Sequence, residues 1–207
     1  MIRSISARIN RRAIVARVKK IIRASEKEIA EIHRLMAASG SYCEYGAGGT
    51  TLLACETGIP RVVSIETSLP FCEEIVRRHN LCRYIETGRL TLRHSDIGET
   101  KEWGFPVEEP SQSQVERYLS WPAAIPDLDL ALVDGRYRVA VAAAIYLASH
   151  AETIVMIHDY ADRPHYHVVE AFLESVRIVD SLPIFQKRVG ARREAARLMD
   201  EYSEVQN

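Results

Sequence analysis

The sharpest chemical signal in this chain is a glycine-rich segment, residues 44–51, with the sequence E-Y-G-A-G-G-T-T. Glycines between a strand and a helix allow a tight turn and let a ligand approach the backbone closely. The dinucleotide fingerprint G-x-G-x-x-G would require its third glycine where Thr51 stands. The carboxylate of Glu44, two residues before Gly46, suits a cationic amino-acid head group better than a pyrophosphate. The segment therefore predicts a nucleotide-type site and disfavours a dinucleotide.

Two further acids follow apolar strand-like runs and extend this expected site. Glu66 closes the run 61–66, where a carboxylate can accept hydrogen bonds from both hydroxyls of a ribose. Asp96 follows the run 89–94, where an acid can accept from an adenine amino group, although a turn or helix-cap role is an equal alternative. The expected ligand-binding residues are Glu44, Tyr45, Gly46, Ala47, Gly48, Glu66, Thr67, Asp96, Ile97 and Asp134.

A second group of chemical residues follows two later strand-like runs. Asp134 ends the run 128–134 and is a candidate for orienting a nucleophile, accepting its proton or holding a metal. His158 follows the run 153–157 and titrates near neutrality, so it is a candidate general base beside Asp159.

Three more residues near these strand ends are candidates for binding a small acceptor, namely Arg136, Arg138 and Tyr160. The two guanidinium groups can pair with a carboxylate or phosphate of that acceptor. The alternative is that both arginines pair with acids of the long segment that precedes them.

The elements that must position these residues alternate between strands and helices. Strands are predicted at 41–45, 61–66, 89–94, 128–134 and 153–157, and helices at 50–57, 68–79, 138–150 and 166–176. This alternation predicts an α/β fold built on a parallel sheet. Residues 177–180 and 184–189 are expected to add an antiparallel pair, followed by a final helix over 191–204.

Two segments depart from this rhythm. Residues 97–126 contain several prolines and read as a long loop, whose aromatic residues we expect to anchor it rather than to contact a substrate. The N-terminal region, about 1–38, opens with a basic amphipathic helix over the first 24 residues. We expect this helix to pack on the protein body or on a second copy in a homodimer. The alternative is peripheral contact with an acidic membrane surface.

Composition places the chain among ordinary globular proteins. Of its 207 residues, 47% are hydrophobic and 27% are charged, and the net charge is −1. One domain over 1–207 is expected. Apolar runs fall short of the ~20 residues that span a bilayer, and the basic start resembles no secretory signal, so we expect a cytoplasmic protein. The N-terminal arginines lack interleaved aromatics, so nucleic-acid binding is not supported.

The chain resembles the class I S-adenosylmethionine (SAM)-dependent methyltransferases over about residues 40–160. The E-x-G-x-G turn, Glu66, Asp96 and Asp134 follow the order of that family, although Thr50 stands where many members have a third glycine. The strings at 96–107 and 132–138 are similar to a small bacterial group of methyltransferase-like proteins whose substrates are not established. The resemblance implies a Rossmann-like, doubly wound, mainly parallel seven-stranded sheet with the last strand reversed. It also implies SAM as cofactor, but it implies no substrate. Our leading hypothesis is methyl transfer from SAM to O or N of a small acceptor.

Three alternatives remain open. In metal-dependent O-methyltransferases, acids in the positions of Asp134 and Asp159 hold a divalent cation, but Tyr160 stands where those enzymes carry Asn, so a cation is the less favoured expectation. A non-catalytic SAM-binding or interaction module using the basic helix is the second alternative. An NAD-dependent oxidoreductase is the third, and Thr51 and Glu44 disfavour it.

Overall fold

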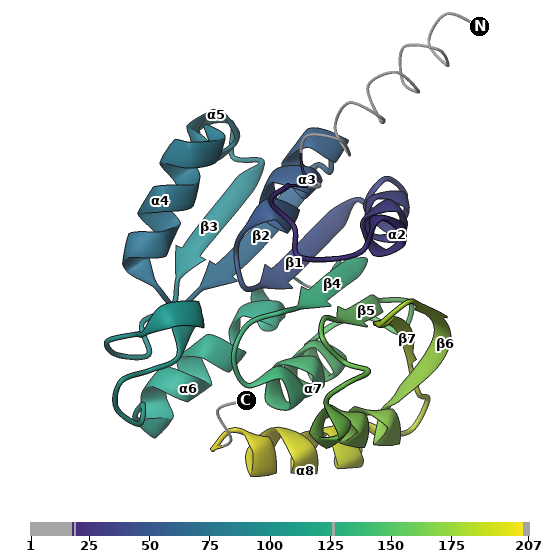
Figure 1. Cartoon of the computed structure of the whole chain (residues 1–207). Helices are drawn as coiled ribbons and strands as arrows, with labels where there is room; N and C mark the ends of the chain where they lie inside the picture. Colours follow the sequence, from purple (N-terminus) through teal and green to yellow (C-terminus); the bar gives the residue numbers. More distant parts are fainter. Residues whose placement is uncertain (1–17, 19, 126, 205–207) are drawn as a thin grey trace, which may run out of the picture.

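Seven strands form one sheet in the order β3-β2-β1-β4-β5-β7-β6 (Figure 1). The computed structural model describes residues 18, 20–125 and 127–204. The strands are β1 (Ser41–Tyr45), β2 (Arg61–Glu66), β3 (Leu90–His94), β4 (Leu130–Val133), β5 (Ile154–Ile157), β6 (Leu173–Val179) and β7 (Leu182–Lys187). Strands β1 to β5 pair in parallel, and β7 lies antiparallel to both of its neighbours. The predicted α/β sheet with a reversed last strand is confirmed.

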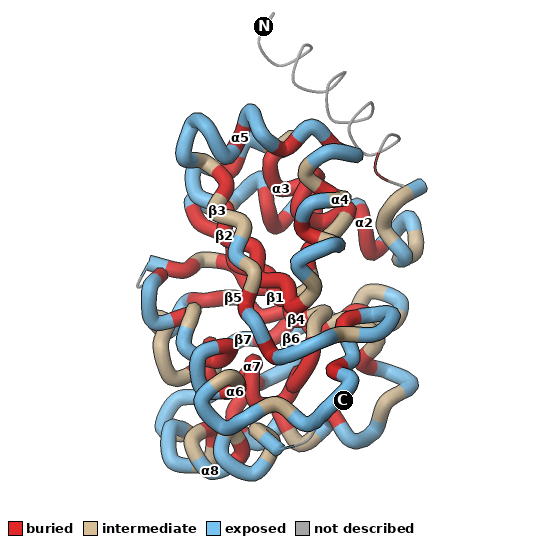
Figure 2. Tube along the Cα trace, turned by 90° about the vertical axis from the view of Figure 1, so that its left-hand side faces the viewer, coloured by how far each residue is buried: buried red, intermediate tan, exposed pale blue. Residues whose placement is uncertain are grey.

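The sheet separates two hydrophobic cores because successive strand residues point to opposite faces. In β1, Tyr42 belongs to one core, whereas Cys43 and Tyr45 belong to the other. In β4, Leu132 and Val133 divide in the same way. Figure 2 shows the central strands β1, β4 and β5 as the buried centre of the molecule, whereas the edge strand β6 is largely exposed.

Helices cover both faces of the sheet, as a doubly wound fold requires (Figure 1). One layer holds α2 (Glu26–Met36), α3 (Gly49–Thr57), α4 (Leu69–His79) and α5 (Cys82–Glu86). The other holds α6 (Gln112–Leu119), α7 (Arg138–Ala148) and α8 (Arg192–Tyr202). Short 3₁₀ helices occur at η1 (Glu102–Gly104), η2 (Trp121–Ala124) and η3 (Pro164–Ala171). No helix in the described part of the chain is long and apolar enough to cross a membrane.

The start of α2 follows from local sequence and from one distant contact. Ser25 and Glu28 form a reciprocal capping box, which satisfies two backbone N–H groups at the helix start. Glu28 also accepts hydrogen bonds from the backbone and side chain of Ser181, at 3.0 and 2.7 Å, and so ties α2 to the β6–β7 turn. The basic helix expected over the first 24 residues lies outside the described residues, apart from 18 and 20–24.

The predicted helix over 166–176 is wrong. The structure has the 3₁₀ helix η3, which ends at Ala171, followed by the edge strand β6 from Leu173. β-branched Val176 and Ile178 are 50% and 61% exposed, so this end of β6 forms the edge of the sheet rather than part of its core. The expected antiparallel pair is present, and its turn lies at 180–181 rather than at Leu182 and Pro183.

The expected long loop over 97–126 contains regular structure. Helix α6 begins at a capping box formed by Ser111 and Gln114, and buries Val115, Tyr118 and Leu119 on one face. The spacing of these three residues is helical, so it indicates a helix within a segment that otherwise contains several prolines.

Candidate active site

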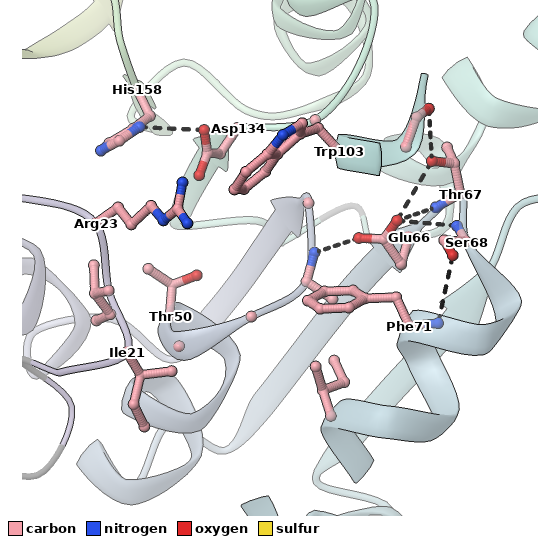
Figure 3. A pocket seen from close by; sticks show the side chains of 18 of the residues that line it. Ile21, Arg23, Thr50, Glu66, Thr67, Ser68, Phe71, Trp103, Asp134 and His158 are labelled. Carbon is pink, nitrogen blue, oxygen red and sulfur yellow. Dashed lines mark hydrogen bonds and ion pairs between the residues drawn. The ribbon is translucent and has the colours of Figure 1, made fainter. Parts of the chain in front are cut away.

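A cavity of about 750 Å³ opens where the strands β1, β2 and β4 end (Figure 3). Its wall comes from segments that are distant in sequence: residues 20–23, the glycine segment 46–50, residues 66–68 with one side of α4, residues 101–104, and residues 134–136 with His158. In Figure 3, Glu66 and Phe71 lie at one end, Asp134, His158 and Arg23 lie at the other, and Trp103 lies between the two ends. The predicted site residues Glu66, Asp134 and His158 therefore face one space.

Glycine is required at two places where backbones meet beside this cavity. Gly46 has φ of +95°, and a Cβ there would lie 2.9 Å from the carbonyl group of Asp134. A Cβ on Gly135 would lie 2.6 Å from the Tyr118 hydroxyl and 3.1 Å from the carbonyl carbon of Tyr45. The loops after β1 and β4 thus touch directly, which only residues without a side chain allow. Gly48 has open space beside its Cα and lines the cavity, as does Ala47.

Glu44 does not face the cavity, so the expected contact with a ligand ammonium group is wrong. The side chain is fully buried and accepts hydrogen bonds from the hydroxyls of Tyr42 (2.9 Å), Thr50 (2.6 Å), Ser64 (2.8 Å) and Thr51. Burial raises the pKa of Glu44, and these four hydroxyls act in the opposite direction. The residue fixes the glycine segment from beneath, and the threonines at 50 and 51, which depart from the glycine patterns, supply two of its donors.

Glu66 lies at the end of β2 and lines the cavity as expected. Its carboxylate is 8% exposed and accepts hydrogen bonds from the backbone N–H groups of Ala47 (3.1 Å), Thr67 (2.8 Å) and Ser68 (3.0 Å). Burial raises the pKa of Glu66, while these backbone donors oppose the rise. The donors hold the carboxylate between the glycine segment and the start of α4.

Three other expected ligand contacts lie away from the cavity. Asp96 is exposed and accepts from the backbone N–H of Gly98 at 2.9 Å, which makes it a turn residue. Ile97 is 1% exposed and Tyr45 is fully buried, and both belong to the hydrophobic core. The structure therefore gives no support to ligand contact by Asp96, Ile97 or Tyr45. Phe71 of α4 lines the Glu66 end of the cavity instead.

At the opposite end, His158 sits between two carboxylates. Its Nδ1 lies 3.2 Å from Asp134 and 3.2 Å from Asp159. Burial alone would lower the pKa of His158, but the hydrogen bond to Asp134 and the two negative charges raise it above the ordinary value of 6.5. An Nδ1 proton shared with Asp134 leaves Nε2 as the proton-accepting nitrogen of the neutral ring.

The same carboxylates are neutralised by arginines, which bears on the metal expectation. Ligand atoms of Asp134, His158 and Asp159 lie within 4.8 Å of one another. The guanidinium of Arg138, however, lies 3.1 Å from Asp134 and 3.6 Å from Asp159, and Arg163 lies 3.0 Å from Asp159. A divalent cation would have to share these oxygens with two positive charges, so the donor set does not suit one.

Arg138 and Tyr160, two of the three expected acceptor-binding residues, are occupied within the protein. Besides its two carboxylates, Arg138 donates to the carbonyls of Gly135 (3.1 Å) and His158. Tyr160 is 5% exposed and donates to Glu170 at 2.8 Å. Neither lines the cavity, so their expected roles are wrong. The alternative, that both arginines pair with acids of the preceding segment, is also wrong.

Arg136 does line the cavity. Its side chain is buried, and its guanidinium carbon lies 3.9 Å from the centre of the Phe105 ring. Burial, and then the charge of Arg138, lowers the pKa of Arg136 from its ordinary value.

Two segments cover the cavity from outside. The side chain of Ile22 packs so closely on Gly49 that a Cβ at Gly49 would lie 2.7 Å from it. Arg23 lies over the ring of Trp103, 4.3 Å from its centre. Trp103 is 64% exposed, so it is not anchored to the body as we expected for this segment. Sequence patterns did not indicate this cover, because it depends on the N-terminal segment folding back over the glycine segment.

Several solved structures similar to this chain are methyltransferases or methyltransferase-like proteins. A methyltransferase-like protein from Silicibacter pomeroyi is 26% identical, with a TM-score of 0.68 over 86% of this chain and 96% of that one. A methyltransferase from Geobacter sulfurreducens is 13% identical, with a TM-score of 0.52 over 85% and 90% of the two chains. The MycE methyltransferase of the mycinamycin biosynthetic pathway, solved with Mg, SAH and mycinamycin VI, is 11% identical, with a TM-score of 0.51 over 84% and 48%.

By sequence, no protein-family model and no curated protein matches the chain. The structural neighbours nevertheless confirm the predicted resemblance: the chain has the fold of the class I SAM-dependent methyltransferases.

Proposed function

We propose that this chain, which has the fold of class I SAM-dependent methyltransferases, binds SAM and transfers its methyl group to an oxygen or nitrogen of a small acceptor. One observation carries the proposal. A single cavity has the glycine segment and Glu66 at one end and the proton-accepting pair of His158 and Asp134 at the other (Figure 3).

The Glu66 end suits a nucleoside. The carboxylate faces the cavity while backbone donors hold it in place, so it can accept hydrogen bonds from ribose hydroxyls. Phe71 and Ile75 of α4 add apolar surface for a base. Gly46 and Gly48 allow close approach of the ligand to the backbone.

The His158 end suits proton removal from an acceptor. SAM supplies an electrophilic methyl group on its sulfonium. A lone pair of the acceptor oxygen or nitrogen forms the new bond to that carbon, and the carbon–sulfur bond breaks with its electrons remaining on sulfur. Nε2 of His158 takes the acceptor proton, and Asp134 holds the ring through Nδ1 and stabilises the imidazolium. Such a transfer depends mainly on positioning the acceptor against the methyl group. The acceptor is the nucleophile, so the scheme requires no nucleophilic side chain from the protein.

A transfer assay tests this assignment. The full chain is incubated with methyl-labelled SAM and the low-molecular-weight fraction of a bacterial extract, and label is followed into small products. We expect transfer by the wild type and a loss of roughly 10²-fold or more in His158→Gln, with SAM affinity unchanged. His167→Gln is the matched control, because His167 is exposed and stacks on Tyr160 away from the cavity. Normal SAM binding without any transfer would instead favour a non-catalytic SAM-binding module.

A further inference from the structure

Arg136 carries a buried charge that no described residue neutralises. Its side chain is 6% exposed, and its Nε and Nη1 atoms have no hydrogen-bond partner. Among the ion pairs of the described residues, none involves Arg136. Its closest described aromatic partner is the face of Phe105, a ring that is 42% exposed.

The neighbouring Arg138 shows how this protein treats a buried arginine with a structural role. Arg138 is 3% exposed, and its guanidinium contacts the carboxylates of Asp134 and Asp159 and three backbone carbonyls. Burying a charge without such partners is strongly unfavourable. Two arginines that lie two residues apart therefore differ: Arg138 is satisfied within the protein, whereas Nε and Nη1 of Arg136 are satisfied by no described residue.

The backbone that carries Arg136 is firmly placed. Its N–H donates to the hydroxyl of Tyr118 at 3.2 Å, and Tyr118 is itself 1% exposed in α6. The adjoining Gly135 packs against the same hydroxyl. Arg136 is thus held on the cavity wall two residues from Asp134, and its guanidinium lies against Phe105.

The charges around the cavity favour an anionic ligand. Five lysine and arginine side chains and three acidic side chains line the cavity. Two of the acids, Glu66 and Asp134, already accept hydrogen bonds or ion pairs from protein donors. An anion beside Arg136 would therefore meet a positive surface rather than a competing carboxylate.

We infer that Arg136 binds a carboxylate or phosphate group of the methyl acceptor, so that the substrate of this enzyme is a small organic anion. This inference rests on the proposed methyl transfer, because it assigns the His158 end of the cavity to an acceptor. A planar guanidinium presents several N–H donors that match carboxylate and phosphate oxygens. The anion anchors the acceptor on Arg136, and a separate oxygen or nitrogen of the same molecule faces His158.

The test uses the full chain saturated with SAH. Isothermal titration measures benzoate and phenyl phosphate as anionic probes, with benzamide as the uncharged counterpart of benzoate. We expect at least one anion to bind, benzamide to bind at least tenfold more weakly than benzoate, and Arg136→Gln to weaken the anion by roughly 10- to 100-fold. The probe that binds better distinguishes a carboxylate from a phosphate acceptor.

Two variants separate this role from general electrostatics. Arg136→Lys, which keeps the charge but loses the planar donors, should recover part of the anion affinity. Arg83→Gln is the control, because Arg83 pairs with Glu56 and does not line the cavity. We expect Arg83→Gln to leave anion binding unchanged.

Several results would overturn the inference. Equal binding of benzamide and benzoate, or absence of anion binding to the SAH-loaded protein, would remove the anion site. Weaker SAH binding in Arg136→Gln with unchanged anion binding would assign Arg136 to the carboxylate of the cofactor. Absence of SAH binding to the wild type would overturn the proposed function itself. A titration with SAH alone, before any anion is added, distinguishes this result from the loss of the anion site.

Discussion

Single charged residues around this site fall into two groups according to whether they face the cavity. Glu44 and Arg138 lie close to the cavity but are bound within the protein. Glu44 accepts hydrogen bonds from hydroxyl groups, and Arg138 pairs with the carboxylates that follow β4 and β5. Glu66, His158 and Arg136 face the cavity. Residue type alone does not separate the two groups, because both contain a glutamate and an arginine.

The raised pKa of His158 predicts how methyl transfer depends on pH. Because the neutral ring must accept the proton, the rate should fall as pH decreases through a midpoint above 6.5. Asp134→Asn removes the hydrogen-bonded charge that raises this pKa and leaves the effect of burial, so the midpoint should move to lower pH. The measurement is the turnover rate from pH 5 to 9 at saturating SAM. A midpoint that does not move in Asp134→Asn would contradict the assignment of His158 as base.

The arginines beside Asp134 and Asp159 predict that methyl transfer does not need a divalent cation. With Arg138 and Arg163 within 3.6 Å of these carboxylates, their negative charge is already compensated. We expect EDTA treatment followed by excess Mg²⁺ to change the turnover rate by less than about twofold, since the donor set is not one that hard cations select. Loss of turnover in EDTA with recovery on Mg²⁺ would show that the cation displaces the guanidinium groups.

At the scale of elements, the site depends on the direct contact between the loops after β1 and β4. Gly46 and Gly135 face one another's backbones there, so the segment that would cradle a ligand and the segment that carries Asp134 are held as one unit. A side chain at this contact should disturb both folding and binding.

Alanine at two glycines with the same backbone conformation tests this contact. Gly46 has φ of +95° with the Asp134 carbonyl in the way, whereas Gly58 has φ of +93° and open space. Both substitutions impose a strained backbone, but only Gly46→Ala adds a clash. We expect Gly46→Ala to lower the free energy of unfolding by about 1–3 kcal/mol more than Gly58→Ala in urea titrations. Equal decreases in the free energy of unfolding would mean that the loops after β1 and β4 can move apart without destabilising the protein.

The sequence predicted much of this architecture, and its errors have physical causes. Strand-end positions of Glu66, Asp134 and His158 follow from topology, since consecutive parallel strands bring their carboxyl ends to one edge. Glu44 was misplaced because alternation along β1 puts it on the same face as Tyr42, toward α3, rather than toward the strand end. Asp96 was misplaced because a turn uses its carboxylate locally.

At the scale of the whole molecule, tertiary contacts complete the cavity in ways that local patterns do not encode. Residues 20–23 fold back over the glycine segment, and Arg23 meets Trp103 from a segment some 80 positions away (Figure 3). The unpaired state of Arg136 likewise depends on which acids the fold brings near it. Only the assembled chain therefore shows which end of the cavity would receive an anion.

Ligand binding should stabilise this assembly as a whole. Because the cavity wall combines both covering segments, the glycine segment and three strand ends, a ligand there binds the folded state and not the unfolded one. At a concentration about 100 times Kd, SAH should raise the free energy of unfolding by about 2.7 kcal/mol, measurable as a higher Tm. An unchanged Tm at that saturation would contradict binding in this cavity.

Calorimetric titration of the wild type with SAM tests the central claim most directly, with NAD as the parallel ligand and two acid variants as site checks. The account predicts saturable SAM binding and no comparable NAD binding. It also predicts that Glu66→Gln weakens SAM by roughly 10- to 100-fold, while Asp96→Asn, which alters a turn outside the cavity, changes the affinity by less than about twofold. Absence of SAM binding, binding of NAD in its place, or a loss of affinity in Asp96→Asn but not in Glu66→Gln would contradict it.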